Sequence, residues 1–408
     1  MKAIVKPKPK EDQDWPIGFS IIDKPEPKVT APGDVIIAVH AGAICGTDVG
    51  IYNGKQSLRK EMMKALTDPV TVGHEFSGRI VDAGKDARKH ITRLIVQKAK
   101  SNRKLKARIR TKTPASLASD KKFAAFLEES FYATAEMHVT CGTCYQCRLG
   151  ERHVCRNTVI KGVHDDGAWA KYVKVPAENV RLFYDREIPP DIIAFMDALG
   201  NATHTVMSAS VKGRNVAVLG CGVQGLMAVA IAKYAGAKRI YVTDASSQSV
   251  SHDKLVNTRF ALAKHYGADA CFDVALESER RGMIDRVRSD TDKTGVDAAF
   301  EMSGAYKAYD DAARILRMGG TFSLLGLPSG THQVDFAKNI IFSGITVHGI
   351  IGRKVFQTWD QMEELLKAGL AKMLVKTGFV THQFPLDGYE EAFAAIHSGD
   401  AYKVLLKP

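Results

Sequence analysis

A glycine-rich turn between an apolar strand and an alanine-rich helix is the feature that most constrains this chain. The strand is expected over Asn215–Leu219, the turn reads Gly220-Cys-Gly222-Val-Gln-Gly225, and the helix runs to Tyr234. The first glycine permits a tight bend, the second lets backbone approach a pyrophosphate, and the third lets helix and strand pack closely. The first N–H groups of the helix would then face the phosphates. The pattern predicts a dinucleotide-binding site.

An acidic residue follows at the end of the next expected strand, Arg239–Thr243. Asp244 lies nineteen residues after Gly225, where a carboxylate can accept hydrogen bonds from both ribose hydroxyls. The same carboxylate would repel a 2′-phosphate, so the sequence favours NAD over NADP. A structural turn with a capping aspartate is the alternative, but it does not explain strand, glycines and acid in this order.

Further alternation of strands and helices predicts an α/β fold with a doubly wound parallel sheet. Later strands are expected at Ala298–Glu301, Thr321–Leu325 and Thr346–Ile351. Apolar residues then recur at helical spacing from Trp359 to Leu370. The first third of the chain instead shows short strand signals broken by Gly and Pro, typical of a small barrel or an irregular sheet. These signals are Ala3–Val5, Val35–Val39 and Gly78–Val81.

Four cysteines lie within fifteen residues, spaced C-x2-C-x2-C-x7-C. Four thiolates can close a tetrahedral shell around Zn²⁺ and leave no open position, which is typical of a structural site. Buried thiols or a disulfide pair are the alternatives. We expect a cytoplasmic, reducing location, because no signal peptide or membrane-length apolar run is evident, and a disulfide fits that location poorly. The four are Cys141, Cys144, Cys147 and Cys155.

A second set of metal-binding residue types is spread more widely. Cys45 lies in Ile-Cys-Gly-Thr-Asp, and His74 and Glu75 lie in Val-Gly-His-Glu-Phe-Ser-Gly. Taken singly they would be a core thiol, a hydrogen-bonded histidine and a surface glutamate. Together with the cysteine cluster and the glycine turn, their order resembles that of the zinc-dependent medium-chain alcohol dehydrogenases.

Within that family the chain looks most similar to the L-threonine 3-dehydrogenases. The resemblance implies a GroES-like β-barrel catalytic domain with a structural zinc lobe, followed by a Rossmann coenzyme domain. It places them at residues 1–197 and 198–350, with a return to the catalytic domain at 351–408, and it implies a homotetramer. The stretches that carry it are Ala43-Ile-Cys-Gly-Thr-Asp48, His138-Val-Thr-Cys-Gly142, Cys155-Arg-Asn-Thr158, Asp197-Ala-Leu-Gly-Asn-Ala-Thr-His-Thr205 and Gly349-Ile-Ile-Gly-Arg-Lys-Val-Phe-Gln-Thr-Trp359.

The resemblance also implies a reaction and residue roles. The reaction is oxidation of the C3 hydroxyl of L-threonine to 2-amino-3-oxobutanoate, with hydride passing to NAD. Cys45 and His74 would bind a catalytic zinc, and Glu75 would complete or support its shell. Thr47 and Asp197 would carry the hydroxyl proton outward, and His138 would recognise the substrate or lie on the barrel surface. Residues expected to line NAD are Gly220, Gly222, Gln224, Gly225, Asp244, Arg259, Leu325, Gly326, Leu327, Ile350 and Ile351.

Three departures from the family pattern stand out. Gly50 occupies the position of an expected relay histidine. A basic segment, roughly residues 88–130, replaces a Gly-Asp turn, and Ser246–Asn257 is a second surplus. We expect the first segment to form a surface helix or to stay disordered. It is either a genuine surface loop that adds an anionic partner or an oligomer contact, or retained non-coding sequence, which would explain two unrelated surpluses. The second origin is favoured because the segment displaces the Gly-Asp turn close to the active site without an obvious replacement.

Charge adds little to the functional interpretation. Residues 88–112 hold eleven Lys and Arg and no acid, nearly the whole net charge of +12. A nucleic-acid-binding module there would rest on charge alone, without interleaved aromatics, so we expect no nucleic-acid or membrane partner. The remaining alternatives are a polyol dehydrogenase of the sorbitol, xylitol or butanediol type, and a catalytically impaired, zinc-stabilised binding protein.

Overall fold

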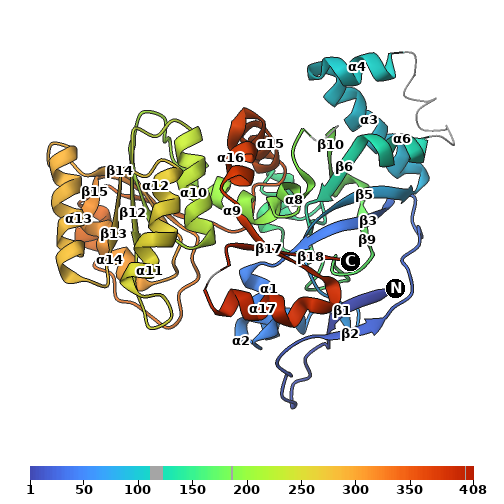
Figure 1. Ribbon diagram of the computed structural model, residues 1–408, viewed down its shortest axis with the longest axis horizontal. Coiled ribbons are helices and arrows are strands. Elements are labelled where there is room, and N and C mark those ends of the chain that lie inside the picture. The colour runs from blue at the N-terminus through green and yellow to red at the C-terminus, as the bar shows by residue number, and fades with distance from the viewer. Residues whose placement is uncertain (111–122, 185–186, 400) are drawn as a thin grey trace. The chain divides into compact units, whose positions relative to one another are not determined.

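In the computed structural model, which describes residues 1–110, 123–184, 187–399 and 401–408, the chain enters a second folding unit and later returns to the first (Figure 1). Unit 1 comprises Met1–Asp197 and Phe379–Pro408, and unit 2 comprises Ala198–Gly378. The sequence placed the return at residue 351, whereas it occurs at Phe379. The intervening helices belong to unit 2, where Gly369 lies so close to Tyr234 that an added Cβ would be 3.1 Å from its hydroxyl oxygen.

The sheets of unit 1 are antiparallel except where β17 (Val380–Pro385) pairs in parallel with the C-terminal strand. The central pair is β3 (Asp34–Ala43) with β5 (Glu75–Ala83), and the C-terminal strand β18 (Lys403–Lys407) pairs with β3 on its other side. The last residues of the chain therefore lie beside the segments that carry Cys45 and Glu75. The other strands of this sheet are β6 (Phe131–Ala135), β9 (Tyr172–Pro176), β10 (Val180–Tyr184) and β17 (Val380–Pro385). The smaller sheets are β1 (Lys2–Lys6), β2 (Ser20–Asp23) and β4 (Val70–Thr71), and β7 (His138–Val139) with β8 (Val159–Ile160).

The basic segment forms helices that pack against this sheet. Helix α3 (Lys85–Ser101) buries Ile91 and Ile95 in one cluster with residues of β5, β6 and β10, while its Lys and Arg side chains lie on other faces. Helices α4 (Arg103–Ile109) and α6 (Phe123–Ser130) follow, and Figure 1 shows α4 beside α3 and α6 beside β5 and β6. The expectation of a surface helix is met in part, but one of its faces is core. Residues 111–122 lie outside the described part of the chain.

Shorter helices complete unit 1. Helix α1 (Gly46–Tyr52) begins directly after Cys45, whereas α9 (Met196–Met207) begins one residue before Asp197 and continues into unit 2. The remaining helical segments are α2 (Gln56–Met62), α7 (Tyr145–Arg148), η1 (Arg152–Val154), η2 (Ala177–Asn179), α8 (Pro190–Ile193), η6 (Leu386–Gly388) and α17 (Tyr389–His397). Among the described residues of both units, no helix combines the length and apolar character needed to span a membrane.

Unit 2 is a six-stranded, wholly parallel sheet in the order β13-β12-β11-β14-β15-β16. From β11 the chain adds β12 and β13 on one side of the sheet, and then adds β14, β15 and β16 on the other side. In such sheets ligands bind outside the carboxyl ends of the strands at the point where this order switches, here between β11 and β14. The strands are β11 (Asn215–Leu219), β12 (Arg239–Asp244), β13 (Ala270–Asp273), β14 (Val296–Glu301), β15 (Leu316–Leu324) and β16 (Thr346–Gly349).

Helices cover both faces of the parallel sheet, as a doubly wound fold requires. Figure 1 shows α10 and α12 on one face and α13 and α14 on the other. The helical segments are α10 (Val223–Tyr234), α11 (His252–Leu255), η3 (Val256–Phe260), α12 (Ala261–His265), α13 (Glu277–Asp290), α14 (Tyr306–Ile315), η4 (Ala337–Ile341), α15 (Gln357–Leu365), η5 (Leu366–Leu370) and α16 (Ala371–Lys376).

Candidate active site and metal centres

The four clustered cysteines converge in a lobe built on α7 and η1. Cys155 Sγ lies 3.5 Å from Cys141 Sγ and 3.8 Å from Cys144 Sγ, and one ligand atom from each of the four cysteines lies within 4.8 Å of the others. A tetrahedron with Zn–S bonds of about 2.3 Å has edges of about 3.8 Å. No disulfide forms among the seven cysteines, all of which are free thiols. The cluster therefore has the size and the donor type that zinc requires.

The pKa shifts of the clustered cysteines also favour a bound cation. Backbone N–H groups, that of Thr143 above all, lower the pKa of Cys141 to about 5. Burial and the neighbouring thiols instead raise the pKa of Cys147 to about 12. Four adjacent thiolates repel one another, so a dication is what allows all four to be deprotonated together.

Cys45, His74 and Glu75 also come together, with one ligand atom of each within 4.8 Å of the others. Cys45 caps helix α1, and Glu75 opens strand β5. The position before His74 requires glycine, because Gly73 has φ +87° and an added Cβ would lie 2.2 Å from the ring of Trp169. His74 and Glu75 are buried. One thiolate, one imidazole and one carboxylate form a donor set that suits zinc with a further position open.

Two buried charged residues that the sequence did not single out support this set. Asp48 accepts a hydrogen bond from the Cys45 N–H at 2.9 Å and lies 3.3 Å from Nδ1 of His74. Lys403 Nζ lies 2.5 Å from Oε2 of Glu75 and donates to the Ile44 carbonyl at 2.9 Å. Asp48 stands in the Cys-Gly-Thr-Asp motif, which could have signalled it. Lys403 comes from β18, and no local pattern links it to Glu75.

Asp197 and His138, both predicted from resemblance, lie together with a third residue, Glu136. One ligand atom of each lies within 4.8 Å of the others. Burial raises the pKa of Glu75, Lys403 counteracts this, and the charge of Asp197 adds to the rise, so Asp197 lies within electrostatic reach of Glu75. Glu136 is the residue of this trio that sequence reasoning missed, although it stands two residues before His138.

Thr47 and Gly50 lie on α1. Thr47 is half-buried in the first turn, two residues after Cys45. A Cβ at Gly50 would lie 2.4 Å from Cδ1 of Leu58, so a side chain of helix α2 fills the space where a residue at this position would project. Position 50, where the resemblance predicts a relay histidine, is instead packed closely against α2.

The predicted dinucleotide residues of unit 2 follow the carboxyl ends of its strands. Gly220 has φ +105°, and a Cβ at Gly225 would lie 1.8 Å from the Gly220 carbonyl oxygen, so both positions require glycine. Asp244 ends β12, and Nη1 of Arg259 donates to its Oδ2 at 2.9 Å. Gly222 and Gln224 begin α10, Leu325, Gly326 and Leu327 follow β15, and Ile350 and Ile351 follow β16.

Comparison with known proteins agrees with this architecture. The family model for the alcohol dehydrogenase GroES-like domain matches residues 31–103 and 133–184, and the model for zinc-binding dehydrogenases matches residues 224–368. The gap between the first two ranges, residues 104–132, covers most of the basic segment. The chain is 35% identical to an L-threonine 3-dehydrogenase of Bacillus velezensis, covering all of this chain and 99% of that protein. An L-threonine 3-dehydrogenase of Caldanaerobacter subterraneus is 34% identical over the same shares.

Solved structures share the fold at lower identity. The 2R,3R-butanediol dehydrogenase of Bacillus subtilis superimposes with a TM-score of 0.73 at 24% identity, covering all of this chain and 99% of that one. A zinc-binding dehydrogenase of Sinorhizobium meliloti bound to NADP gives 0.69 at 25% identity over the same shares. The matched family and the NADP-bound neighbour support zinc and a nucleotide cofactor, and the curated dehydrogenase relatives support a small-molecule alcohol as the substrate class. With two matched models and full-length relatives at 35% identity, the chain belongs to the zinc-binding alcohol dehydrogenase family.

Proposed function

We propose that the chain oxidises the C3 hydroxyl of L-threonine to 2-amino-3-oxobutanoate, with NAD as hydride acceptor. The observation that carries the proposal is full-length similarity, at 34–35% identity, to L-threonine 3-dehydrogenases of several bacteria. The acidic trio of Glu136, His138 and Asp197 supports it, because an amino-acid substrate brings a positive charge to the site.

Two zinc sites are part of the proposal. Cys141, Cys144, Cys147 and Cys155 would hold a structural ion, and Cys45, His74 and Glu75 would hold the catalytic one. When bound, the catalytic zinc acts as a Lewis acid that lowers the pKa of the substrate hydroxyl. Asp48 orients His74, and Lys403 balances the charge of Glu75. Thr47 and Asp197 would accept and pass on the hydroxyl proton, so that hydride leaves C3 as the carbonyl forms.

NAD is proposed over NADP because of Asp244. Its carboxylate stands at the end of β12, where it can accept from the ribose hydroxyls, and Arg259 holds one of its oxygens at 2.9 Å. A 2′-phosphate would meet this carboxylate and be repelled. Gly220, Gly222, Gln224 and Gly225 would receive the pyrophosphate, and Leu325, Gly326, Leu327, Ile350 and Ile351 would line the nicotinamide side. A tenfold preference for NADP, about 1.4 kcal/mol, would contradict this assignment.

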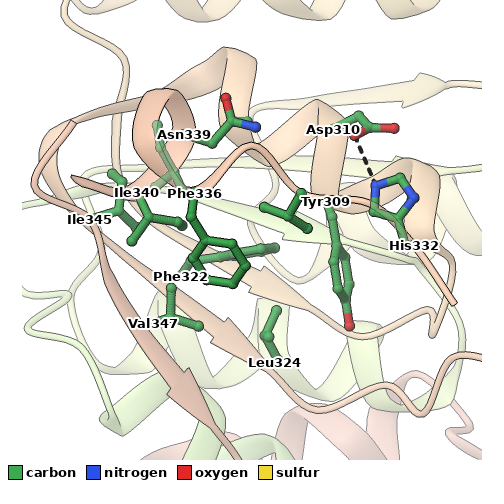
Figure 2. A pocket seen from close by; sticks show the side chains of 13 residues that line it. Tyr309, Asp310, Phe322, Leu324, His332, Phe336, Asn339, Ile340, Ile345 and Val347 are labelled. Atoms are coloured by element: carbon green, nitrogen blue, oxygen red, sulfur yellow. Dashed lines mark hydrogen bonds and ion pairs between the residues drawn. The ribbon is translucent and has the colours of Figure 1, made fainter. Parts of the chain in front are cut away.

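We further propose that the chain forms a homo-oligomer through unit 2, with a tetramer as the expected state. Strand β16 is an edge of the parallel sheet, paired with β15. Beside it lies a hollow of about 230 Å³ with mostly apolar walls from α14, β15, β16 and η4. Figure 2 shows Phe336 and Ile340 over this hollow, opposite Tyr309. Phe342, just after η4, is 78% exposed. An exposed sheet edge flanked by apolar side chains fits a second copy of the chain.

The test is NADH formation with L-threonine beside a panel of polyols, at equal enzyme and NAD concentrations. We expect L-threonine to have the highest kcat/KM, and Cys45→Ser to abolish turnover while NAD still binds. If sorbitol or a butanediol reacts far better, the substrate assignment is wrong and a polyol dehydrogenase is the answer. A protein that binds zinc and NAD but oxidises none of these alcohols would instead be a binding protein.

A further inference from the structure

Glu301 is a buried carboxylate at the switch point of the parallel sheet. It ends β14, and the order of the strands switches between β11 and β14. Ligands of such sheets bind outside the carboxyl ends of the strands at this point. The Glu301 side chain is fully buried, and an ionised group is costly to bury unless something compensates its charge. The surroundings of this carboxylate therefore bear on the candidate dinucleotide site.

One oxygen of Glu301 holds the turn that follows β14. Oε1 accepts hydrogen bonds from the Ser303 N–H at 2.7 Å, the Ser303 hydroxyl at 2.5 Å and the Gly304 N–H at 2.8 Å. Three donors on one oxygen fit an ionised carboxylate, which only accepts. All three donors are uncharged, so they orient the group without neutralising it. Oε2 is also buried and has no hydrogen-bond partner in the part of the chain that the structure describes.

Oε2 faces the loop after β15. A Cβ at Gly326 would lie 2.6 Å from this oxygen and 2.2 Å from the Gly304 nitrogen, so position 326 requires glycine. The N–H groups of Leu325 and Gly326 donate to the backbone carbonyl of Glu301 at 3.0 and 3.3 Å. The loop that is proposed to line the nicotinamide therefore rests directly on Glu301.

The turn after Glu301 also contacts the glycine turn. A Cβ at Gly220 would lie 2.8 Å from Cβ of Ser303, and the Met302 N–H donates to the Leu219 carbonyl at 2.9 Å. All of these residues belong to unit 2. Glu301 and its turn thus join the segment proposed to receive the pyrophosphate to the segment proposed to line the nicotinamide.

The charge of Glu301 acts beyond its own hydrogen bonds. Burial raises the pKa of Tyr309 on α14, and the negative charge of Glu301 adds to the rise. Charges interact more strongly in a buried, low-dielectric site than in water. A cation beside the loop at residues 325–327 would therefore be stabilised by this carboxylate.

Hydride transfer changes the charge of the nicotinamide ring. The hydride leaves C3 of the alcohol with both electrons of its C–H bond and joins C4 of the ring, while the hydroxyl proton leaves separately. The ring is cationic before this step and neutral after it. A fixed negative charge nearby therefore interacts differently with the two forms of the cofactor.

We propose that Glu301 is a positioning residue for the nicotinamide end of the cofactor, and that its uncompensated charge favours the oxidised, cationic ring over the reduced, neutral one. The inference rests on the proposed function, and it adds a residue that sets the balance between binding of NAD and of NADH. A purely structural role in the turn after β14 is the alternative, and the experiment separates the two.

Glu301→Gln tests the charge, since it keeps the size of the side chain and an acceptor oxygen for the turn. Titration calorimetry without substrate gives the Kd of NAD, of NADH and of ADP-ribose, which lacks the nicotinamide ring. We expect the Kd of NAD to rise about five- to tenfold, because the attraction between the buried charge and the cationic ring is lost. The Kd values of NADH and ADP-ribose should change less than about twofold.

Glu277→Gln is the matched control, because it removes the same charge from unit 2 at an exposed side chain 3.7 Å from Arg281. Its three Kd values should equal those of the wild type. Glu301→Asp keeps the charge, so the ratio of the Kd values for NAD and NADH should stay near that of the wild type, even where the shorter side chain weakens the turn.

Ser303→Ala is the second variant, to be used if Glu301→Gln does not fold. It keeps the charge and removes the hydroxyl that partly offsets it, so NAD should bind about twofold more tightly relative to NADH. An unchanged or lower preference for NAD in this variant would overturn the inference.

The remaining outcomes of Glu301→Gln are equally decisive. Equal weakening of NAD, NADH and ADP-ribose would make Glu301 structural, and unchanged affinities would give its charge no role. Both results overturn the inference and leave the proposed function standing, provided that the wild type forms NADH from L-threonine. A wild type that binds neither NAD nor NADH would overturn this inference together with the proposed function.

Discussion

Lys403 and Glu75 form an ion pair in which both side chains are almost wholly buried. Such a pair adds little net stability compared with an apolar one, yet removing one partner leaves an uncompensated charge. Lys403 also donates to the carbonyl just before Cys45. One cation from the last strand thus holds two of the segments that present the candidate zinc ligands.

Replacing Lys403 by Met should therefore lower the free energy of unfolding of the metal-free protein by about 3–5 kcal/mol, as urea denaturation would measure. The matched control is Lys407→Met on the same strand. Lys407 also pairs with a carboxylate at 2.5 Å, that of Asp191, but both side chains are partly exposed, so its loss should cost about 0–1 kcal/mol. Equal effects of the two substitutions would show that burial of the Glu75 pair does not matter.

At the scale of elements, helix α3 shows how composition can hide a core face. Its Lys and Arg content predicts a solvated segment, but Ala87, Ile91, Ile95 and Ala99 repeat at four-residue spacing and are buried. We expect Ile91→Ala and Ile95→Ala each to lower the free energy of unfolding by about 2–5 kcal/mol. Val96→Ala, on a partly buried position of the same helix, is the control and should cost less. Wild-type stability in both isoleucine variants would mean that α3 does not pack on the sheet.

The second surplus, Ser246–Asn257, is joined to β13 through a histidine. His252 Nδ1 lies 2.9 Å from Asp273 Oδ2, and Glu279 is 3.7 Å from the other ring nitrogen. The hydrogen bond to Asp273 raises the pKa of His252, with Glu279 and Asp253 adding to the rise. The folded state thus holds the proton more tightly than the unfolded state, so this stabilisation is complete below about pH 6.5 and is lost as pH rises through the folded pKa.

His252→Gln should accordingly cost stability at pH 6 and little at pH 9. The measurement is the difference in urea midpoint between variant and wild type at the two values of pH. His332→Gln, at a histidine 3.2 Å from Asp310, is the control for histidine–carboxylate pairs elsewhere in unit 2. A difference that grows with pH would reverse the sign and reject the linkage.

For the whole molecule, the sequence predicts what local patterns encode. The glycine turn, the strand ending at Asp244 and the four close cysteines each specify a short-range geometry, and the family match bears out the fold they indicate. Lys403 and Glu136 were not foreseen. The pairing of Lys403 with Glu75 depends on β18 lying beside β3, a long-range register that no periodicity reports. The proximity of Glu136 to Asp197 likewise depends on the tertiary fold rather than on a local pattern.

The apolar edge of unit 2, at β16 and the residues after η4, predicts that the chain assembles into an oligomer. Phe342 is 78% exposed and Val347 lies on edge strand β16, and a monomer in water gains nothing from this exposure. We expect light scattering of the wild type to give a multiple of the 44.6 kDa chain mass. Phe342→Glu with Val347→Lys should shift it toward the monomer, since charges at a sheet edge oppose pairing. Val375→Glu, at an exposed apolar residue on α16, should not. A wild type that is monomeric at micromolar concentration would reject this surface as an interface.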